Sequence, residues 1–259
     1  MHLASVDGSI GPASEAVIPV TDEGLLRGDA AFEVVRLYDG RPYALGEHLA
    51  RLRSTCLGLR LEHDFTALER EIGAILEEAA GADGLLRLVL TRGGRRLVMV
   101  EPRPAHPATA TVATVTFSPT RLLDGLKTVS YAANMLAGRL AREQGADEAL
   151  FVTPHGRVLE GPTWSFFWVS EGRLLTPPLS ERILASITRA KVLQTSEVEE
   201  RVCTLDDLRS ADEAFIASTV REVLPIARID DRDLPDAPGP VTAAARAALR
   251  TCIERELGA

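Results

Sequence analysis

The sequence predicts an α+β protein of two domains, on the evidence of two patterns. Over the first 118 residues, alternation typical of strands gives way to two stretches with helical spacing and then returns. A stretch with Pro119 and Gly125 follows, and after it short strands and helices alternate to the end. At 259 residues the chain is long enough for two moderate domains. We therefore expect a small α+β domain over residues 1–118, a linker over 119–125 and a larger domain over 126–259.

The first domain is expected to begin with a hairpin, because the pair Asp7-Gly8 suits a tight turn between short strands. Residues 16–20 also have the composition of a strand, and residues 22–29 read as a glycine-punctuated loop. A strand rich in β-forming residues covers 31–38. The following Asp39-Gly40 predicts a second hairpin.

The period then changes to that of helices. Leu49, Leu52 and Cys56 recur at helical spacing, and a second helix is expected over residues 64–80. The remaining strands of this domain are expected at residues 85–92, 97–100 and 109–117.

The second domain is expected to begin with a helix from Tyr131 to Gln144, closed by Gly145. Another helix lies within residues 183–196 and starts near Ser186. Shorter elements and a final amphipathic helix are expected at residues 148–152, 158–159, 165–169, 173–175, 205–210, 214–218 and 240–257.

Composition and charge argue against several classes of protein. The net charge of −8 argues against a nucleic-acid partner, which would require a basic face. Three widely spaced cysteines fit a reduced, cytoplasmic protein, and the five histidines lack metal-ligand spacing, so no metal site is expected. There is no signal-peptide pattern and no apolar run of about 20 residues, so no membrane span is expected.

Lysine is unusually scarce in this chain. Of 29 basic residues only Lys127 and Lys191 are lysines. Arginine stays charged inside proteins, whereas a lysine amine can lose its proton on burial and attack a carbonyl group. A retained lysine is therefore a candidate for amine chemistry, although a surface lysine spared by chance also explains the count. We interpret Lys191, a few residues into a helix, as such a surface lysine.

Groups that a phosphorylated aldehyde cofactor needs occur around and after Lys127. Its amine can supply an imine nitrogen, and Glu160 can pair with a ring nitrogen that must stay protonated for the ring to accept electrons. Ser186-Ile187-Thr188 begins a helix and offers N–H groups to a phosphate. Each signal is weak alone, because a serine at a helix start is most often only a cap. Further candidate groups are Arg51, Ser218 and Thr219.

The order and spacing of several motifs are more specific. In chain order they are Asp22-x-Gly-x-x-x-Gly-Asp-x-x-Phe-Glu33, Glu47-His-Leu-x-Arg-Leu52, Thr91-Arg-Gly93, Lys127-x-x-x-Tyr-x-x-Asn134, Gly145-Ala-Asp-Glu148, Gly156-Arg-Val-Leu-Glu-Gly161, Leu175-Thr-Pro177, Ile183-Leu-x-x-Ile-Thr-Arg189 and Gly239-Pro-Val-Thr242. In these motifs the chain resembles the fold-type IV pyridoxal-phosphate enzymes, which include D-amino-acid and branched-chain aminotransferases and aminodeoxychorismate lyases. The resemblance implies pyridoxal 5′-phosphate as cofactor, a small α/β sandwich domain, a larger pseudo-barrel domain and a homodimer.

The resemblance also implies a role for individual residues. Lys127 would form the Schiff base with the cofactor and then move the proton between the substrate Cα and the cofactor C4′. Glu160 would pair with the pyridine nitrogen, and Tyr131 would hydrogen-bond the ring hydroxyl. The phosphate would be bound by Arg51, Ile187, Thr188, Ser218 and Thr219.

The substrate pocket departs from the family pattern. Arg27 stands where D-amino-acid aminotransferases tend to have an uncharged residue, Phe32 replaces a frequent tyrosine, and their arginine and histidine carboxylate trap after Gly93 is not evident. We expect Arg27 and Arg87 to clamp the substrate carboxylate. The alternative for Arg87 is a structural ion pair, because a charge on a strand face beside apolar residues needs a partner.

Several activities remain open at this point. The preferred one is a ping-pong transaminase for an amino acid, with D-amino acids favoured, and a 2-oxo acid, because two candidate carboxylate-binding arginines are present. One alternative is a branched-chain L-amino-acid aminotransferase. Another is a 4-amino-4-deoxychorismate lyase, because residues 127–135 and 159–163 resemble sequences of that lyase. The last alternative is a non-catalytic protein that only binds the cofactor. In the expected dimer, Arg27 could serve its own site or that of the neighbouring subunit.

Overall fold

The computed structural model describes residues 2–258, which form two compact units. The first unit consists of the described residues up to Pro104 together with Leu126–Tyr131, and the second of Ala105–Gly125 and the described residues from Ala132 onward. These bounds differ from the expected domain ranges for two reasons. The strand at residues 110–116 pairs within the second unit, and residues 126–131 hydrogen-bond to a strand of the first.

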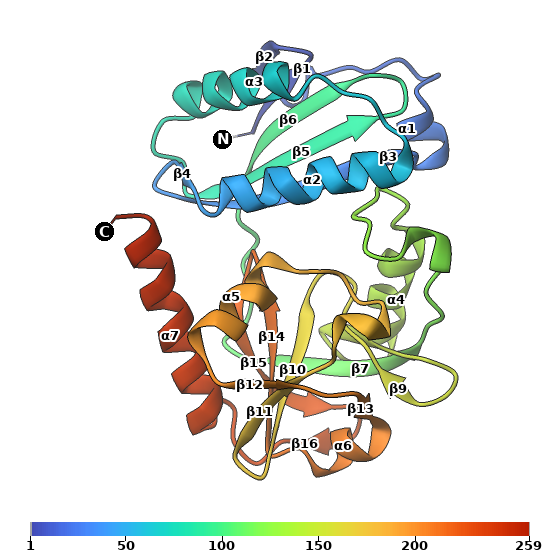
Figure 1. Cartoon of the computed structure of the whole chain (residues 1–259), viewed down its shortest axis with the longest axis vertical. Helices are drawn as coiled ribbons and strands as arrows, with labels where there is room; N and C mark the ends of the chain where they lie inside the picture. Colours follow the sequence, from blue (N-terminus) through green and yellow to red (C-terminus); the bar gives the residue numbers. More distant parts are fainter. Residues whose placement is uncertain (1, 259) are drawn as a thin grey trace. The chain divides into compact units, whose positions relative to one another are not determined.

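The first unit is built on an antiparallel sheet with the strand order β2-β1-β6-β5-β3-β4. Helix α2 lies along β3, and α3 lies along β6 and β1 (Figure 1). Their buried leucine, isoleucine and valine side chains form one core with the sheet. The elements are β1 Leu3–Val6, β2 Ser9–Pro12, α1 Glu23–Arg27, β3 Ala30–Tyr38, β4 Arg41–Pro42, α2 Leu45–Leu59, α3 Phe65–Glu78, β5 Gly84–Thr91 and β6 Arg96–Pro102.

Both predicted hairpin turns are confirmed. Asp7-Gly8 joins β1 to β2 with φ of 52° and 92°, and Asp39-Gly40 joins β3 to β4 with φ of 48° and 78°. Two successive residues with positive φ match the right-handed twist of the flanking strands, which is why Asp-Gly is favoured there.

The prediction of a loop over residues 22–29 is wrong in part, because α1 forms within it. Buried Asp22 caps this helix by accepting the Gly24 N–H at 2.7 Å, and the Thr91 hydroxyl donates to the same carboxylate at 2.8 Å. Gly28 then ends the helix with φ of 68°. A tertiary contact with β5 thus stabilises a helix too short to be stable alone.

The prediction of a strand over residues 16–20 is also wrong. Val17 and Val20 are 80% and 75% exposed, so neither is packed against a sheet in the described structure. Pro19 lacks the N–H that a strand ladder requires.

The second unit contains a larger mixed sheet with the order β12-β11-β10-β14-β15-β7-β8-β9-β13, and β16 pairs with β15. Helix α7 packs along β15 and β14, α5 packs against α7, and α4 covers β7 and β8 (Figure 1). The elements are β7 Ala110–Thr116, α4 Ala132–Glu143, β8 Glu148–Val152, β9 Arg157–Val158, β10 Ser165–Ser170, β11 Arg173–Thr176, α5 Ile187–Thr195, β12 Val198–Glu200, β13 Cys203–Thr204, α6 Leu205–Ser210, β14 Glu213–Ser218, β15 Glu222–Ile229, β16 Arg232–Asp233 and α7 Pro240–Glu256.

Strands β10 and β14 form the centre of this unit. Almost every residue of both is buried, which explains their continuous apolar sequences. β15 was not predicted from the sequence, because Pro225 lies inside it and proline is depleted in strands. It pairs with β14 on one side and, in parallel, with β7 on the other.

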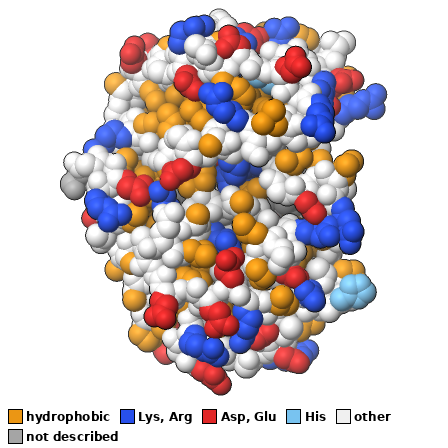
Figure 2. All heavy atoms as spheres, viewed as in Figure 1, with side chains coloured by type: hydrophobic (Ala, Val, Ile, Leu, Met, Phe, Trp, Pro, Cys, Tyr) orange, Lys and Arg blue, Asp and Glu red, His pale blue; other side chains and the backbone are white. Residues whose placement is uncertain are grey.

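The surface carries charges of both signs. Figure 2 shows acidic and basic side chains interspersed over the face in view. Within residues 2–258, no helix combines the length and apolar character needed to cross a membrane.

Candidate active site

Lys127 lies in a short extended segment that is hydrogen-bonded to β3. The Phe32 N–H donates to the Lys127 carbonyl oxygen at 3.0 Å, and the Val129 N–H donates to the Ala30 carbonyl oxygen at 2.9 Å. The Lys127 N–H donates to the hydroxyl of Thr55 on α2 at 3.2 Å. A strand and a helix therefore hold the lysine backbone, which fixes where its side chain begins.

The Lys127 amine lies over an aromatic ring. Its Nζ is 4.4 Å from the centroid of the Phe32 ring, which meets the Tyr131 ring edge-on with centroids 5.2 Å apart. The face of an aromatic ring attracts a cation by about 0.5–1 kcal/mol at exposed sites and by more when desolvated. The structure thus brings together three residues that the sequence proposed for cofactor and substrate.

Arg51 is paired with a carboxylate to which the sequence assigned no role. Its Nε and Nη2 donate to the two oxygens of Glu33 on β3, at 2.6 and 2.8 Å. His48 Nδ1, one helical turn before Arg51 on α2, lies 2.7 Å from Oε2 of the same carboxylate. Glu33 and His48 are 0% and 1% exposed. The cluster joins β3 to α2.

The ionisation of this cluster follows from its burial and its partners. Burial alone would raise the pKa of Glu33, but hydrogen bonds from Arg51 and His48 lower it from 4.5 to about 2. Burial lowers the pKa of His48 despite the opposing effect of Glu33. At neutral pH the cluster therefore contains an ionised Glu33 and a neutral His48 that donates through Nδ1. The sequence did hold a signal, because Glu33 alternates with apolar Ala31 and Val35 on one strand face.

Arg87 lies on the same sheet face as Phe32. In the β3–β5 ladder Phe32 is opposite Val89 and Val34 is opposite Arg87, and opposed side chains share a face. Arg87 Nε and Nη2 donate to the carboxylate of Glu101 on β6 at 2.8 and 3.0 Å. The two side chains are 33% and 26% exposed. Arg87 thus has the ion-pair partner that its alternative interpretation requires, and it remains accessible.

Arg27 is the last residue of α1, and its side chain is exposed. The next residue, Gly28, accepts a hydrogen bond at 3.0 Å from the hydroxyl of Ser130 in the Lys127 segment. A Cβ on Gly28 would lie 3.0 Å from that hydroxyl oxygen, so the approach requires glycine.

Glu160 lies in the second unit and is tied to the segment that leads into α5. Its Oε1 accepts the Leu184 N–H at 2.9 Å. Two residues later, the Pro162 carbonyl oxygen accepts a hydrogen bond at 3.0 Å from Asn134 on α4. The carboxylate is half-buried, and both its side chain and the loop after it are restrained.

The start of α5 has the geometry of an anion site. The Ser186 hydroxyl caps the helix by accepting the Arg189 N–H at 3.2 Å, as the sequence predicted. The first N–H groups of a helix, here those of Ile187 and Thr188, have no partner within it and attract anions.

Ser218 and Thr219 stand at the end of β14. The Ser218 hydroxyl is buried and accepts the Arg221 N–H at 3.2 Å. The Arg221 side chain donates to Glu148 at 2.5 Å, and the Trp164 indole donates to the other oxygen of Glu148 at 3.0 Å. The turn after β14 is therefore held in place by Arg221, a residue that the sequence did not single out.

Lys191 is not the solvated surface lysine that the sequence predicted. Its side chain is 7% exposed, and its Nζ donates to both carboxylate oxygens of Glu256 on α7 at 2.9 and 3.0 Å. Packing of α5 against α7 buries this amine in an ion pair.

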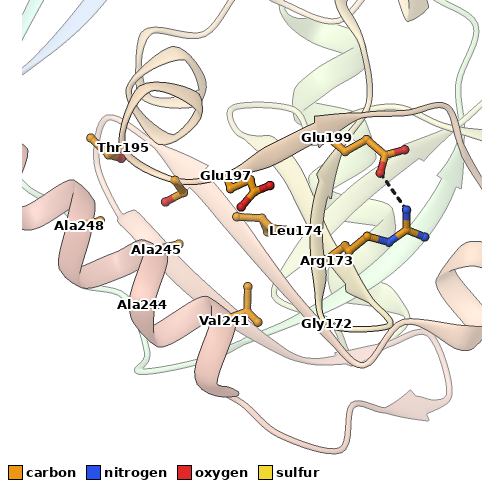
Figure 3. A pocket seen from close by; sticks show the side chains of 11 residues that line it. Gly172, Arg173, Leu174, Thr195, Glu197, Glu199, Val241, Ala244, Ala245 and Ala248 are labelled. Carbon is orange, nitrogen blue, oxygen red and sulfur yellow. Dashed lines mark hydrogen bonds and ion pairs between the residues drawn. The ribbon is translucent and has the colours of Figure 1, made fainter.

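A groove of about 450 Å³ lies elsewhere in the second unit (Figure 3). It is lined by Leu174 of β11, by the end of α5 and by Val241 and Ala245 of α7. Arg173 and Glu199 also line it and form an ion pair at 3.1 Å. None of the site residues expected from the sequence lines this groove.

Comparison with known proteins identifies the family. The chain matches the model of the family described as amino-transferase class IV over residues 30–229. It is 31% identical to a D-alanine aminotransferase of Bacillus licheniformis over 274 residues, 96% of each chain. It is 33% identical over 254 residues, 88% of each chain, to a Methanocaldococcus jannaschii protein provisionally named a branched-chain-amino-acid aminotransferase.

Among solved structures, a hypothetical aminotransferase from Mycobacterium tuberculosis in a PLP-bound form is similar, with a TM-score of 0.90 at 25% identity. The match covers 98% of this chain and 99% of that one. A second form of the same protein holds alpha-ketoglutarate and PMP. The chain therefore belongs to the class IV aminotransferases, and the expected fold-type IV architecture is confirmed.

Enzymes of this family use pyridoxal 5′-phosphate, as the sequence predicted. The donor set of this chain fits the group chemically. Lys127 offers an amine that lies over the Phe32 ring, and Arg51 offers a guanidinium that is paired with the buried carboxylate of Glu33. The capped start of α5 offers N–H groups to a phosphate.

Proposed function

We propose that this enzyme transfers an amino group between a D-amino acid and a 2-oxo acid by a ping-pong reaction. The observation that carries the proposal is the position of Arg87, which shares a sheet face with Phe32, the residue beneath the Lys127 amine. A guanidinium there can bind the substrate carboxylate by paired hydrogen bonds. We favour the D hand because the relative that matches 96% of this chain is named a D-alanine aminotransferase.

Each residue then has a defined task. When bound, pyridoxal 5′-phosphate supplies an electron sink for the electron pair left at the substrate Cα. Lys127 would take the proton from the substrate Cα and deliver it to the C4′ carbon of the cofactor, and Tyr131 would donate a hydrogen bond to the ring hydroxyl. Glu160 keeps the pyridine nitrogen protonated. Phosphate binding is assigned to Arg51, Ile187, Thr188, Ser218 and Thr219.

A panel of D- and L-amino acids tests the proposal. With the holoenzyme and one amino acid, we expect D-amino acids to convert the bound cofactor to pyridoxamine phosphate while releasing a 2-oxo acid. A 2-oxo acid added next should restore the starting spectrum. Conversion by L-amino acids alone would overturn the D assignment.

A branched-chain L-amino-acid aminotransferase is the second candidate. Val34, Val89, Leu97 and Met99 are half-buried and share the sheet face of Arg87, a wall that suits an apolar side chain. The same panel separates the two hands. Release of pyruvate from 4-amino-4-deoxychorismate without amino transfer would instead establish the lyase.

A cytoplasmic homodimer is also part of the proposal. Val17, Val20, Leu25 and Leu26 are at least 57% exposed and precede Arg27 in the chain. Large apolar side chains gathered on a surface mark association sites. The three cysteines are free, which fits a reducing compartment.

A further inference from the structure

Glu33 is a charged residue on an otherwise apolar strand face. It alternates on β3 with Ala31, Val35 and Leu37, and all four side chains are 0% exposed. An ionised carboxylate is costly to bury unless it is paired and hydrogen-bonded. Its partners should therefore explain its presence, and both come from α2.

The pairing fixes how the Arg51 guanidinium is oriented. Nε and Nη2 both donate to Glu33, so one edge of the planar group faces the carboxylate. The terminal edge, formed by Nη1 and the second hydrogen of Nη2, therefore faces a different direction from the edge that pairs with Glu33. His48 contacts Oε2 at 2.7 Å and restrains rotation of the carboxylate. This leaves the guanidinium preorganised for an anion approaching its terminal edge.

Glu33 is also close in the chain to the lysine segment. The preceding residue, Phe32, donates its N–H to the Lys127 carbonyl oxygen and places its ring below the amine. One short piece of β3 thus holds both the lysine segment and the Arg51 side chain.

We propose that Glu33 is a positioning residue that orients Arg51 toward the phosphate of the cofactor without touching the cofactor itself. The inference rests on the proposed function, which assigns Arg51 to the phosphate. Two effects of Glu33 oppose each other. Its negative charge weakens the attraction of Arg51 for a second anion, whereas its geometry removes the entropy loss of ordering a long side chain on binding. Orientation dominates here because both guanidinium–carboxylate bonds are short and fully buried at the carboxylate.

The test compares pyridoxal 5′-phosphate with pyridoxal, which lacks the phosphate. Dissociation constants of both are measured by absorbance titration of the full chain after cofactor removal. In Glu33→Gln we expect pyridoxal 5′-phosphate to bind about tenfold more weakly, as one lost charge-assisted interaction would produce, with pyridoxal unchanged. Equal weakening of both compounds would mean a structural role, and tighter binding of pyridoxal 5′-phosphate would mean competition. Either result overturns the proposal.

Arg51→Lys tests orientation separately from charge and does not depend on the folding of Glu33→Gln. It keeps the positive charge but cannot pair along one edge and present the other. We expect the same selective loss for pyridoxal 5′-phosphate, and an unchanged constant would overturn the proposal. If the wild type itself binds the two compounds equally, the phosphate assignment in the proposed function fails first.

Glu71→Gln is the matched control. Glu71 is a buried carboxylate in the same unit, paired with Arg96 at 2.8 Å and outside the predicted site. We expect this variant to lower the unfolding temperature while leaving both dissociation constants unchanged. A selective loss in this control would overturn the proposal by showing that any lost buried charge has the same effect.

Discussion

At the scale of single residues, the two lysines show how surroundings decide what one side chain does. Lys127 lies over the Phe32 ring, whereas the Lys191 amine is buried in an ion pair with Glu256. We expect Lys127→Ala to lower kcat by about 10²–10⁴-fold and to abolish the visible absorbance that depends on a covalent bond to the cofactor. Lys191→Met should keep that absorbance but lower the free energy of unfolding by about 1–3 kcal/mol in urea, because Glu256 loses its partner. The reverse pattern would disprove both assignments.

Arg87 allows a second test at this scale. If it binds the substrate carboxylate, Arg87→Ala should raise KM for a 2-oxo acid about tenfold or more, as expected when a hydrogen bond to a charged group is lost. Arg53→Ala, which breaks an exposed ion pair with Glu69, should leave KM unchanged and serves as the control. Steady-state kinetics decides the matter. An unaltered KM in Arg87→Ala would leave the arginine as the structural partner of Glu101.

At the scale of elements, the junction of β3 and α2 predicts a dependence of stability on pH. The pKa of Glu33 falls from 4.5 to about 2 on folding, so its contribution is present above pH 4.5 and is lost as the pH falls toward 2. The stability difference between wild type and Glu33→Gln should therefore shrink by up to about 3 kcal/mol between pH 5 and pH 2. His48, whose pKa also falls on folding, destabilises the wild type in the same direction below pH 6.5. Urea unfolding across this range measures the difference, and a constant value would contradict the prediction.

Two glycines in helical contexts should respond oppositely to alanine. A Cβ on Gly239, at the start of α7, would lie 2.2 Å from the side chain of Glu213, which accepts the N–H groups of Val241 and Thr242 at 3.1 and 2.7 Å. Gly239→Ala should cost about 2–4 kcal/mol through overpacking and a lost cap. Gly73→Ala, at an exposed position of α3 with nothing within 4 Å of the added Cβ, should stabilise by about 0.5–1 kcal/mol. Thermal unfolding compares the two, and a stabilised Gly239→Ala would refute the packing account.

At the scale of the whole molecule, exposed apolar residues lead to the dimer prediction. We expect sedimentation at micromolar concentration to give twice the chain mass. Leu25→Glu combined with Leu26→Glu, at side chains 57% and 63% exposed, should shift the protein to the mass of one chain because each would bury a charge. Leu57→Glu, 72% exposed on α2, is the control and should have no effect. A single-chain wild type would refute the dimer.

The sequence by itself determined several local turns and helix ends, and the family. The turns at Asp7-Gly8 and Asp39-Gly40, the cap at Ser186 and the helix ending at Gly145 depend on interactions between near neighbours, which the sequence displays directly. The family assignment rested on the order of motifs along the chain, and comparison with known proteins confirmed it.

Only the tertiary structure decided which charged groups meet. The pairs Glu33–Arg51, Arg87–Glu101 and Lys191–Glu256 join residues 14 or more positions apart, on different elements. Composition could mark Lys191 as unusual but could not reveal that α7 covers it. An ion pair depends on distance and burial in space, and these arise when elements pack rather than along the sequence. The same reason left α1 and β15 unpredicted, since contacts with distant strands stabilise both.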